Sequence, residues 1–141
     1  MDFLPKETRE GLWYLGSPYS HEDPAMRERR FRAVARVAGK LYEEEGVKTY
    51  CPIAHTHPIE VELLATGAEV RSYEFWLPWD FEFFPAMRGL IITRLPGWRQ
   101  SKGLSQEIPK MLGEGKPCLH VDPRRWFTRA EWQELGGQTF D

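Results

Sequence analysis

The run Gly-Leu-Ile-Ile-Thr at residues 89–93 is the feature that most restricts how this chain can fold. A short, continuously apolar run is typical of a strand buried on both faces, as in the middle of a parallel sheet. Three other stretches also fit strands, at residues 12–15, 47–52 and 118–121. Helical patterns separate these stretches, and strands that alternate with helices predict a parallel sheet covered by helices on both faces.

The clearest helix lies between the first two strands. Asp23 fits an N-cap, Pro24 fits the first helical position and Gly46 fits the position where the helix ends. Apolar residues recur at helical spacing and predict the face that packs on the sheet: Phe31, Val34, Val37, Ala38 and Leu41. Five arginines occupy mostly the other faces, where we expect solvent: Arg27, Arg29, Arg30, Arg32 and Arg36.

The remaining segments are less regular. We expect a loop at residues 53–58 and a helix at residues 80–88, whereas residues 59–84 favour only short helical pieces. A helix follows the third strand and ends at Gly113. Ser105 as its N-cap would put Pro109 in the first turn, where a proline is tolerated. Thr128 predicts the start of a last short helix over residues 129–135.

The predicted fold is a single-domain, three-layer α/β sandwich of flavodoxin or Rossmann type. Its parallel sheet has four or five strands, and helices cover both faces. The domain spans residues 1–141, with a core at about 12–121 and a C-terminal extension at 122–141.

Composition excludes several other classes of protein. The 141 residues are 41% hydrophobic and 28% charged, and 19 basic against 21 acidic residues give a net charge of -2, which does not favour a partner that is a nucleic-acid polymer. No apolar run approaches the roughly 20 residues of a membrane span, and residues 1–11 do not resemble a signal peptide. Cys51 and Cys118 lie in apolar stretches, so we expect reduced thiols in a cytoplasmic protein without membrane partners.

Chemically useful side chains gather in the loops after the predicted strands. Ligands of such folds bind outside the carboxyl ends of the strands, so these loops predict one site. With Ser105 as N-cap, Glu107 would lie in the first helical turn, where the dipole favours an ionised carboxylate. Glu107 would then be either a catalytic group at the mouth of a pocket or a plain complement to the dipole.

Three motifs resemble the nucleoside 2-deoxyribosyltransferase-like superfamily over about residues 12–118. Trp-Tyr-Leu-Gly-Ser-Pro-Tyr at residues 13–19 resembles its opening strand and loop, Tyr-Leu-Ala-Gly/Ser-Pro. Asp80, followed by an apolar segment and the strand at 89–93, is similar to its aspartate element. Ser101-x-Gly103-x-x-x-Glu107 is similar to its Ser/Asp-x-Gly-x-x-x-Glu signature. Other details of the loops look most like an uncharacterised branch.

The resemblance implies cleavage of an N-glycosidic bond or deoxyribosyl transfer. The substrate would be a nucleoside or nucleoside 5′-monophosphate, and the intermediate a covalent glycosyl-glutamate. Glu107 matches the nucleophile, Tyr14 the tyrosine that positions it, and Asp80 the acid that handles the base. Ser17 and Ser101 match positions that face the sugar or a 5′-phosphate. No metal or other cofactor is implied. Further candidates for substrate binding are Tyr19, His55, His57, Trp98 and Gly103.

Two groups of residues leave alternatives open. His55 and His57 are metal ligands, a substrate-facing pair or ordinary loop histidines, and no third ligand is spaced to support a metal. The aromatic stretch at residues 73–84 fits a base-stacking wall, core or a homo-oligomer interface, of which core or interface is favoured. Besides the enzyme, two other hypotheses remain: a non-catalytic nucleotide-binding module on the same fold, and an assembly protein without a pocket.

Overall fold

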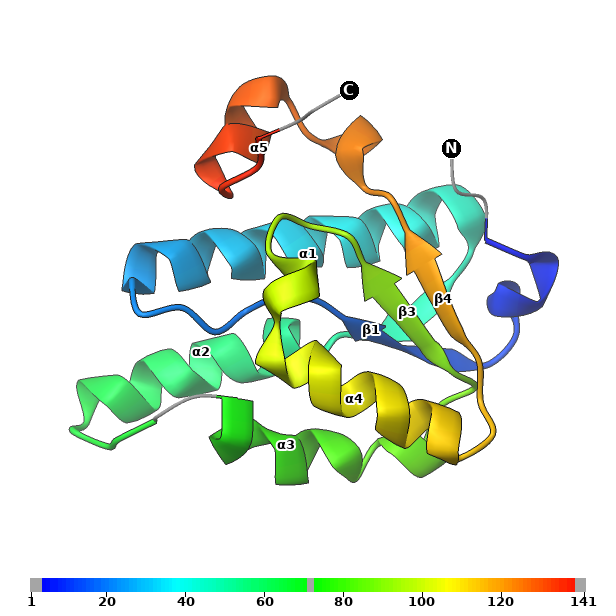
Figure 1. The fold of residues 1–141 in the computed structure, drawn as a ribbon, viewed down its shortest axis with the longest axis horizontal. Coiled ribbons are helices and arrows are strands. Elements are labelled where there is room, and N and C mark those ends of the chain that lie inside the picture. Colours follow the sequence, from blue (N-terminus) through cyan, green and yellow to red (C-terminus); the bar gives the residue numbers. More distant parts are fainter. Residues whose placement is uncertain (1–3, 71–72, 139–141) are drawn as a thin grey trace.

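The centre of the fold is a sheet of four parallel strands in the order β2-β1-β3-β4 (Figure 1). The strands are β1 (Leu12–Gly16), β2 (Lys48–Tyr50), β3 (Leu90–Thr93) and β4 (Cys118–Val121). The structure is a computed structural model that describes residues 4–70 and 73–138. The predicted α/β class and parallel sheet are confirmed. Parts of the predicted domain and of its C-terminal extension, residues 1–3, 71–72 and 139–141, lie outside the described residues.

Helices cover both faces of this sheet. They are α1 (Pro24–Glu45), α2 (Pro52–Ala65), α3 (Tyr73–Phe81), α4 (Lys102–Gly113) and α5 (Arg129–Glu134), and 3-10 turns lie at Lys6–Arg9, Phe84–Ala86, Trp98–Gln100 and Arg124–Trp126. In Figure 1, α1 lies on one side of the sheet, and α3 and α4 lie on the other. None of the described helices has the length and apolar character needed to cross a bilayer.

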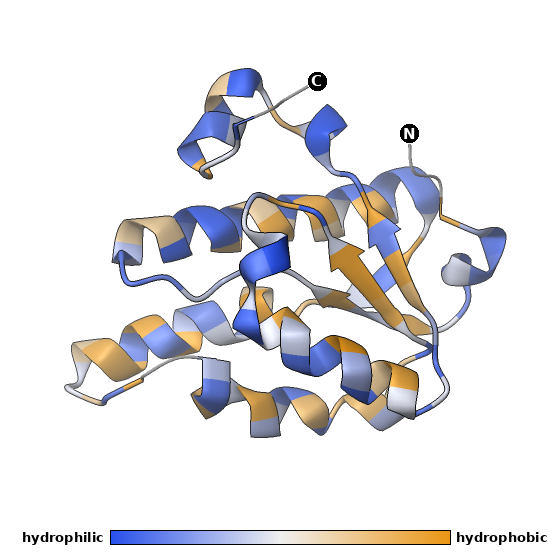
Figure 2. Cartoon of the chain, in the orientation of Figure 1, coloured by the Kyte–Doolittle hydropathy of each residue, from blue (hydrophilic) through white to orange (hydrophobic). Residues whose placement is uncertain are grey.

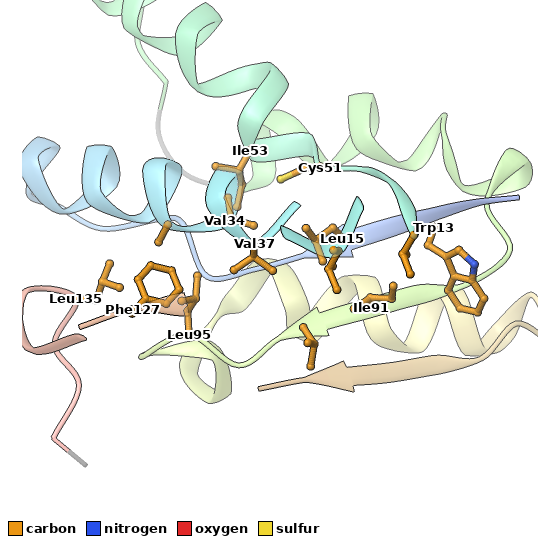
Figure 3. Close-up of a cluster of buried hydrophobic side chains, with 14 of the residues drawn as sticks. Trp13, Leu15, Val34, Val37, Cys51, Ile53, Ile91, Leu95, Phe127 and Leu135 are labelled. Atoms are coloured by element: carbon orange, nitrogen blue, oxygen red, sulfur yellow. The ribbon is translucent and has the colours of Figure 1, made fainter. Parts of the chain in front are cut away.

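Side-chain alternation along the strands produces two separate cores. Trp13, Leu15 and Ile91 point to the α1 side, where they pack with Val34, Val37 and Leu41 and with the C-terminal segment (Figure 3). Tyr14, Leu90 and Ile92 point the other way, toward Phe84, Leu104 and Met111. Both faces of β3 are therefore buried, which explains its continuous apolar colour in Figure 2.

Helix α1 has the predicted ends. The Asp23 side chain accepts a hydrogen bond of 2.9 Å from the Ala25 amide, and Gly46 ends the helix with a φ of 69°. The C-terminal segment is attached to this helix, because Arg36 donates to both carboxylate oxygens of Glu131 and lies over the Phe127 ring. Thr128 caps α5 as predicted, in a capping box with Glu131.

Two of the predicted elements were wrong in the middle of the chain. Residues 53–58 form the start of α2 instead of a loop, because Pro52 occupies the first helical turn, where its missing N–H costs nothing. The helix predicted at 80–88 is absent, since α3 ends at Phe81 and only a 3-10 turn follows before β3. Asp80 therefore lies in the last turn of a helix, not at the start of one.

The predicted N-cap of α4 was also wrong. Ser101 caps this helix by accepting from the Leu104 amide at 3.2 Å, whereas the Ser105 hydroxyl donates back to the Lys102 carbonyl. Pro109 is therefore inside the helix, and Glu107 is in its second turn. The helix dipole acts mainly on the first turn, so it is not what determines the charge of Glu107.

The α1 core predicts a large difference between two leucine substitutions. Leu41→Ala removes a fully buried side chain from α1 and should lower the free energy of unfolding by about 2–5 kcal/mol. Leu112→Ala, on α4 at 55% exposure, should change it by less than about 0.5 kcal/mol. Urea unfolding followed by circular dichroism measures both values. Equal effects of the two substitutions would contradict the core assignment.

Candidate active site

The site begins with a hydrogen bond between β1 and α4. Tyr14 is fully buried on β1, and its hydroxyl donates to Oε2 of Glu107, which is 6% exposed. Phe84 packs edge-on against the Tyr14 ring at 4.7 Å and helps to fix its orientation. The hydroxyl therefore determines where the glutamate carboxylate lies, as the resemblance implies for this pair.

Gly16 permits this close approach of helix and strand. A Cβ atom at this position would lie 2.6 Å from Cδ2 of Leu104 and 3.6 Å from Oε1 of Glu107. The first distance is a clash inside a packed core, so a side chain here would force Leu104 of α4 to shift. The packing of Leu104 therefore explains the glycine in the motif at residues 13–19, independently of the resemblance of that motif to a known family.

Asp80 contributes a second buried carboxylate. It comes from the last turn of α3, is 7% exposed, and its Oδ1 atom is buried with no hydrogen-bond partner. A buried polar atom without a partner is costly, and it commonly marks a position that a ligand or water completes. Ser17, which follows β1 and is 6% exposed, has an Oγ atom in the same condition.

The two carboxyl groups differ in how readily they ionise. Burial raises the pKa of Glu107 to about 7, while the hydrogen bond from Tyr14 opposes this rise by stabilising the carboxylate. Burial and the negative charge of Glu107 together raise the pKa of Asp80 to about 8, although the nearby Tyr14 hydroxyl opposes this rise as well. Glu107 is therefore the first of the pair to lose its proton, and Asp80 keeps its proton longer. Burial and the same two acids also raise the pKa of Tyr14, which stays a hydrogen-bond donor.

Two adjoining cavities open at the carboxyl edge of the sheet. The smaller, of about 50 Å³, is lined by both acids and by Ser17, Ser101 and Gly103. The larger, of about 830 Å³, lies beside it and shares Tyr19, Ser20, Tyr73, Trp76 and Ser101 with it. Tyr14 lies behind Glu107 and does not line either cavity. Pockets of roughly 300–1,000 Å³ are the usual size for small-molecule ligands.

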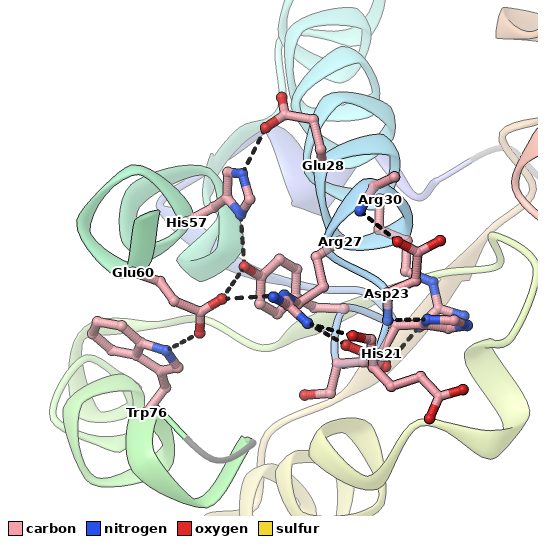
Figure 4. A network of polar contacts seen from close by, with 12 residues as sticks. His21, Asp23, Arg27, Glu28, Arg30, His57, Glu60 and Trp76 are labelled. Atoms are coloured by element: carbon pink, nitrogen blue, oxygen red, sulfur yellow. Dashed lines mark hydrogen bonds and ion pairs between the residues drawn. The ribbon is translucent and has the colours of Figure 1, made fainter. Parts of the chain in front are cut away.

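A polar network forms the wall between α1, α2 and α3 (Figure 4). Glu60 accepts from the Tyr19 hydroxyl at 2.6 Å and from Nε1 of Trp76 at 2.9 Å, and Nε of Arg27 lies 3.6 Å from the same carboxylate. His57 contacts the Tyr19 hydroxyl at 2.6 Å and Glu28 at 3.0 Å through its two ring nitrogens. The network holds Tyr19 at the boundary of the two cavities, and burial beside Glu60 raises the pKa of Tyr19.

The predicted substrate-binding residues divide into two groups. Ser17, Tyr19, Ser101 and Gly103 line the cavity with the two acids. Three others do not line either cavity of the site. His57 is buried behind Tyr19, and His55 is exposed near the Trp79 ring. Trp98 lines a third hollow, of about 390 Å³, that shares Gly97 and Gln100 with the large cavity. The helical geometry of α2 explains the histidines, because residues two apart on a helix point to different sides.

Other residues of this site were not expected from the sequence. Glu60 and Trp76 complete the network, and a helix at 52–65 would have indicated Glu60, since it follows His57 by three positions on one helical face. The expectation that the α1 arginines lie in solvent was wrong for Arg27 and Arg30, which line the large cavity. Within residues 4–70 and 73–138, no three His, Cys, Asp or Glu side chains are grouped to hold a metal ion.

The aromatic stretch at residues 73–84 serves more than one purpose. Trp76 and Phe84 are buried, whereas Phe75 and Trp79 are 49% and 43% exposed. A homo-oligomer interface through the exposed rings stays a prediction.

Cys51 and Cys118 are free thiols, the first buried and the second half-buried.

Comparison with known families identifies the family to which the chain belongs. A family model described as Domain of unknown function (DUF1937) matches residues 11–122. The chain belongs to the DUF1937 family. The DUF1937 match spans β1 through β4 and includes Tyr14, Asp80 and Glu107, while α5 lies beyond it. It does not link the chain to nucleoside 2-deoxyribosyltransferases, and a search of curated proteins found no match.

The buried acids predict an unusual dependence of stability on pH. The pKa of Asp80 is raised from 3.8 to about 8, so its contribution to stability is complete below about pH 4 and is lost as the pH rises to about 8. Asp80→Asn removes the charge and should stabilise the protein at pH 8 by more than about 1 kcal/mol. At pH 4 the variant and the wild type should differ little.

Thermal melts at pH 4, 6 and 8 test this expectation. Glu82→Gln is the matched control, because Glu82 is an exposed carboxylate just after α3. A control that gains as much at pH 8 as Asp80→Asn, or an Asp80→Asn variant with no gain, would contradict the buried-acid assignment.

Proposed function

We propose that this protein cleaves or exchanges the N-glycosidic bond of a nucleoside or nucleoside 5′-monophosphate through a covalent intermediate on Glu107. One observation carries the proposal: two buried carboxyl groups line one cavity, and only one of them, Glu107, accepts a hydrogen bond from Tyr14 in the structure, while Oδ1 of Asp80 has no partner. Pairs of acids whose environments differ in this way commonly divide the roles of nucleophile and proton donor. The resemblance in the motifs at residues 13–19 and 101–107 supports the same roles.

The two acids suit the two halves of the reaction. In the first half, the Glu107 carboxylate forms a bond to the anomeric carbon as the carbon–nitrogen bond breaks, and Asp80 gives its proton to the departing base. In the second half, the Asp80 carboxylate takes a proton from water while the water oxygen replaces Glu107 at the anomeric carbon. A second base can replace water, which gives transfer instead of hydrolysis. Splitting the reaction in this way lowers each barrier.

The groups around the acids fit supporting roles. The Tyr14 hydroxyl holds one oxygen of Glu107, which leaves Oε1 to attack. Ser17 and Ser101 line the cavity beside the acids, where the sugar or its 5′-phosphate would lie. The first residues of α4 line the two cavities, and the N-terminus of a helix favours a negative group.

The two other hypotheses fit these observations less well. A nucleotide-binding module has no need for a tyrosine that aims a buried glutamate, since burying two acids lowers stability without improving affinity for an anion. An assembly protein requires a closed loop region, and a cavity that reaches both acids argues against it.

The decisive variant is Glu107→Gln. The amide keeps the size and the helix position of the side chain but does not form the glycosyl ester, so base release should fall at least about 10³-fold. The protein is incubated with a panel of nucleosides and 5′-monophosphates, and free base is measured by chromatography. Asp80→Asn should act next most strongly, above all for bases that leave only when protonated, and Tyr14→Phe should be milder because it removes only the positioning hydroxyl.

Glu82→Gln is again the matched control and should keep the wild-type rate. Circular dichroism shows that each variant is folded. If Glu107→Gln is folded and releases base at the wild-type rate, the catalytic proposal fails and the nucleotide-binding module becomes the better account.

The same pair of acids predicts a narrow pH optimum for base release. Below about pH 7 Glu107 becomes protonated and stops being a nucleophile, and above about pH 8 Asp80 loses the proton that the base needs. The rate, as kcat/KM, should therefore rise and then fall with a maximum near pH 7–8. A rate that stays constant from pH 5 to 9 would contradict the division of roles.

A further inference from the structure

Arg30 is a half-buried cation at the edge of the large cavity. Its Nη1 donates to the Ser20 carbonyl at 2.9 Å, but its Nε atom is buried and has no hydrogen-bond partner. No carboxylate of the described residues forms an ion pair with it, and burial lowers the pKa of its guanidinium. A desolvated charge without a counter-charge is unfavourable, and a bound anion would compensate for it.

Arg30 lies between the loop after β1 and the loop after β3, at the switch point of the sheet. Arg30 contacts the loop after β1 through Ser20. On the other side, a Cβ atom at Gly97, in the loop after β3, would lie 2.8 Å from Nη2 of Arg30. Gly97 also has a φ of 92°, so this glycine both makes the turn and leaves room for the guanidinium. Ligands of parallel sheets bind between such loops.

Among the cations that line the large cavity, Arg30 combines partial burial with the lack of a paired carboxylate in the described residues. Arg27 faces Glu60 and donates to the His21 carbonyl, so it is already engaged. Glu22 and Glu74 are exposed residues of the lining, as is Lys102. Figure 4 shows the difference between the two arginines of α1, since only Arg27 extends toward the Glu60 network.

We infer that Arg30 binds a phosphate oxyanion of the substrate in the large cavity and thereby selects phosphorylated nucleosides over nucleosides. This inference rests on the proposed function for the identity of the rest of the substrate. The small cavity takes the reacting end of the molecule beside Glu107 and Asp80, and the phosphate end extends toward Arg30. A guanidinium pairs well with phosphate, because two of its N–H groups match two phosphate oxygens.

Binding measurements test Arg30 without any turnover. The Glu107→Gln protein is titrated calorimetrically with the four deoxynucleosides and with their 5′-monophosphates and 5′-diphosphates. The phosphorylated form of at least one nucleoside should bind about tenfold or more tightly than the nucleoside itself. Adding Arg30→Gln should remove most of that preference and leave the affinity for the nucleoside nearly unchanged, because one charge-assisted contact is lost. Adding Arg30→Lys instead should keep part of the preference, since the charge remains but the paired N–H groups do not.

Arg29→Gln is the matched control, because Arg29 is an exposed neighbour on the same helix. It should leave every affinity unchanged, and thermal melts show whether the Arg30 variants remain folded. Comparing monophosphates with diphosphates shows which of the two Arg30 recognises. The inference is overturned if phosphorylated probes show no preference, or if Arg30→Gln keeps the preference. The proposed function fails separately, when the wild type releases no base from any probe.

Discussion

The hydrogen bond from Tyr14 to Glu107 is the contact on which the rest of the site depends. It joins a strand near the start of the chain to a helix near its end, 93 residues apart, inside the core. Gly16 leaves room for the Leu104 side chain of α4, which packs beside this bond. The packing of α4 on β1 and the orientation of the Glu107 carboxylate are therefore linked.

Burying Glu107 and Asp80 in one small cavity lowers the stability of the fold. Glu60 is equally buried, but its carboxylate is paired with Tyr19, Trp76 and Arg27. Elsewhere the faces of the sheet bury mainly Leu, Ile, Val and aromatic side chains. A carboxyl group with a raised pKa makes the native state less stable as the pH increases, so a protein selected only for stability would carry amides or apolar groups here. The chain instead keeps both acids and leaves Oδ1 of Asp80 without a partner. That combination is typical of sites where a substrate supplies the missing contact.

The sequence patterns predicted the fold well where one short signal decides an element. Both ends of α1 were predicted correctly from Asp23, Pro24 and Gly46. The apolar run of β3 correctly indicated a parallel sheet. The patterns failed where prolines are ambiguous. Pro52 starts a helix, whereas Pro109 lies inside one, and only the packing of α4 on β1 decides that Ser101 and not Ser105 caps it. The acids were predicted from short motifs. The roles of Glu60, Trp76 and Arg30 in the site could be recognised only from the packing of the helices in the structure.

The two arginines of α1 show why position matters more than residue type. Arg27 and Arg30 are three residues apart and line the same cavity, yet Arg27 faces the carboxylate of Glu60, whereas Arg30 forms no ion pair with any carboxylate in the described part of the chain. The difference arises from α2, which brings Glu60 and His57 against one end of α1 and leaves the next turn facing the loops of β1 and β3. One turn of α1 therefore contributes to the polar network that holds Tyr19. The next turn presents Arg30, a positive charge without a paired carboxylate in the described residues. Both lie at the same edge of the parallel sheet as the cavity of the two acids, because the loops of such a sheet converge at one edge.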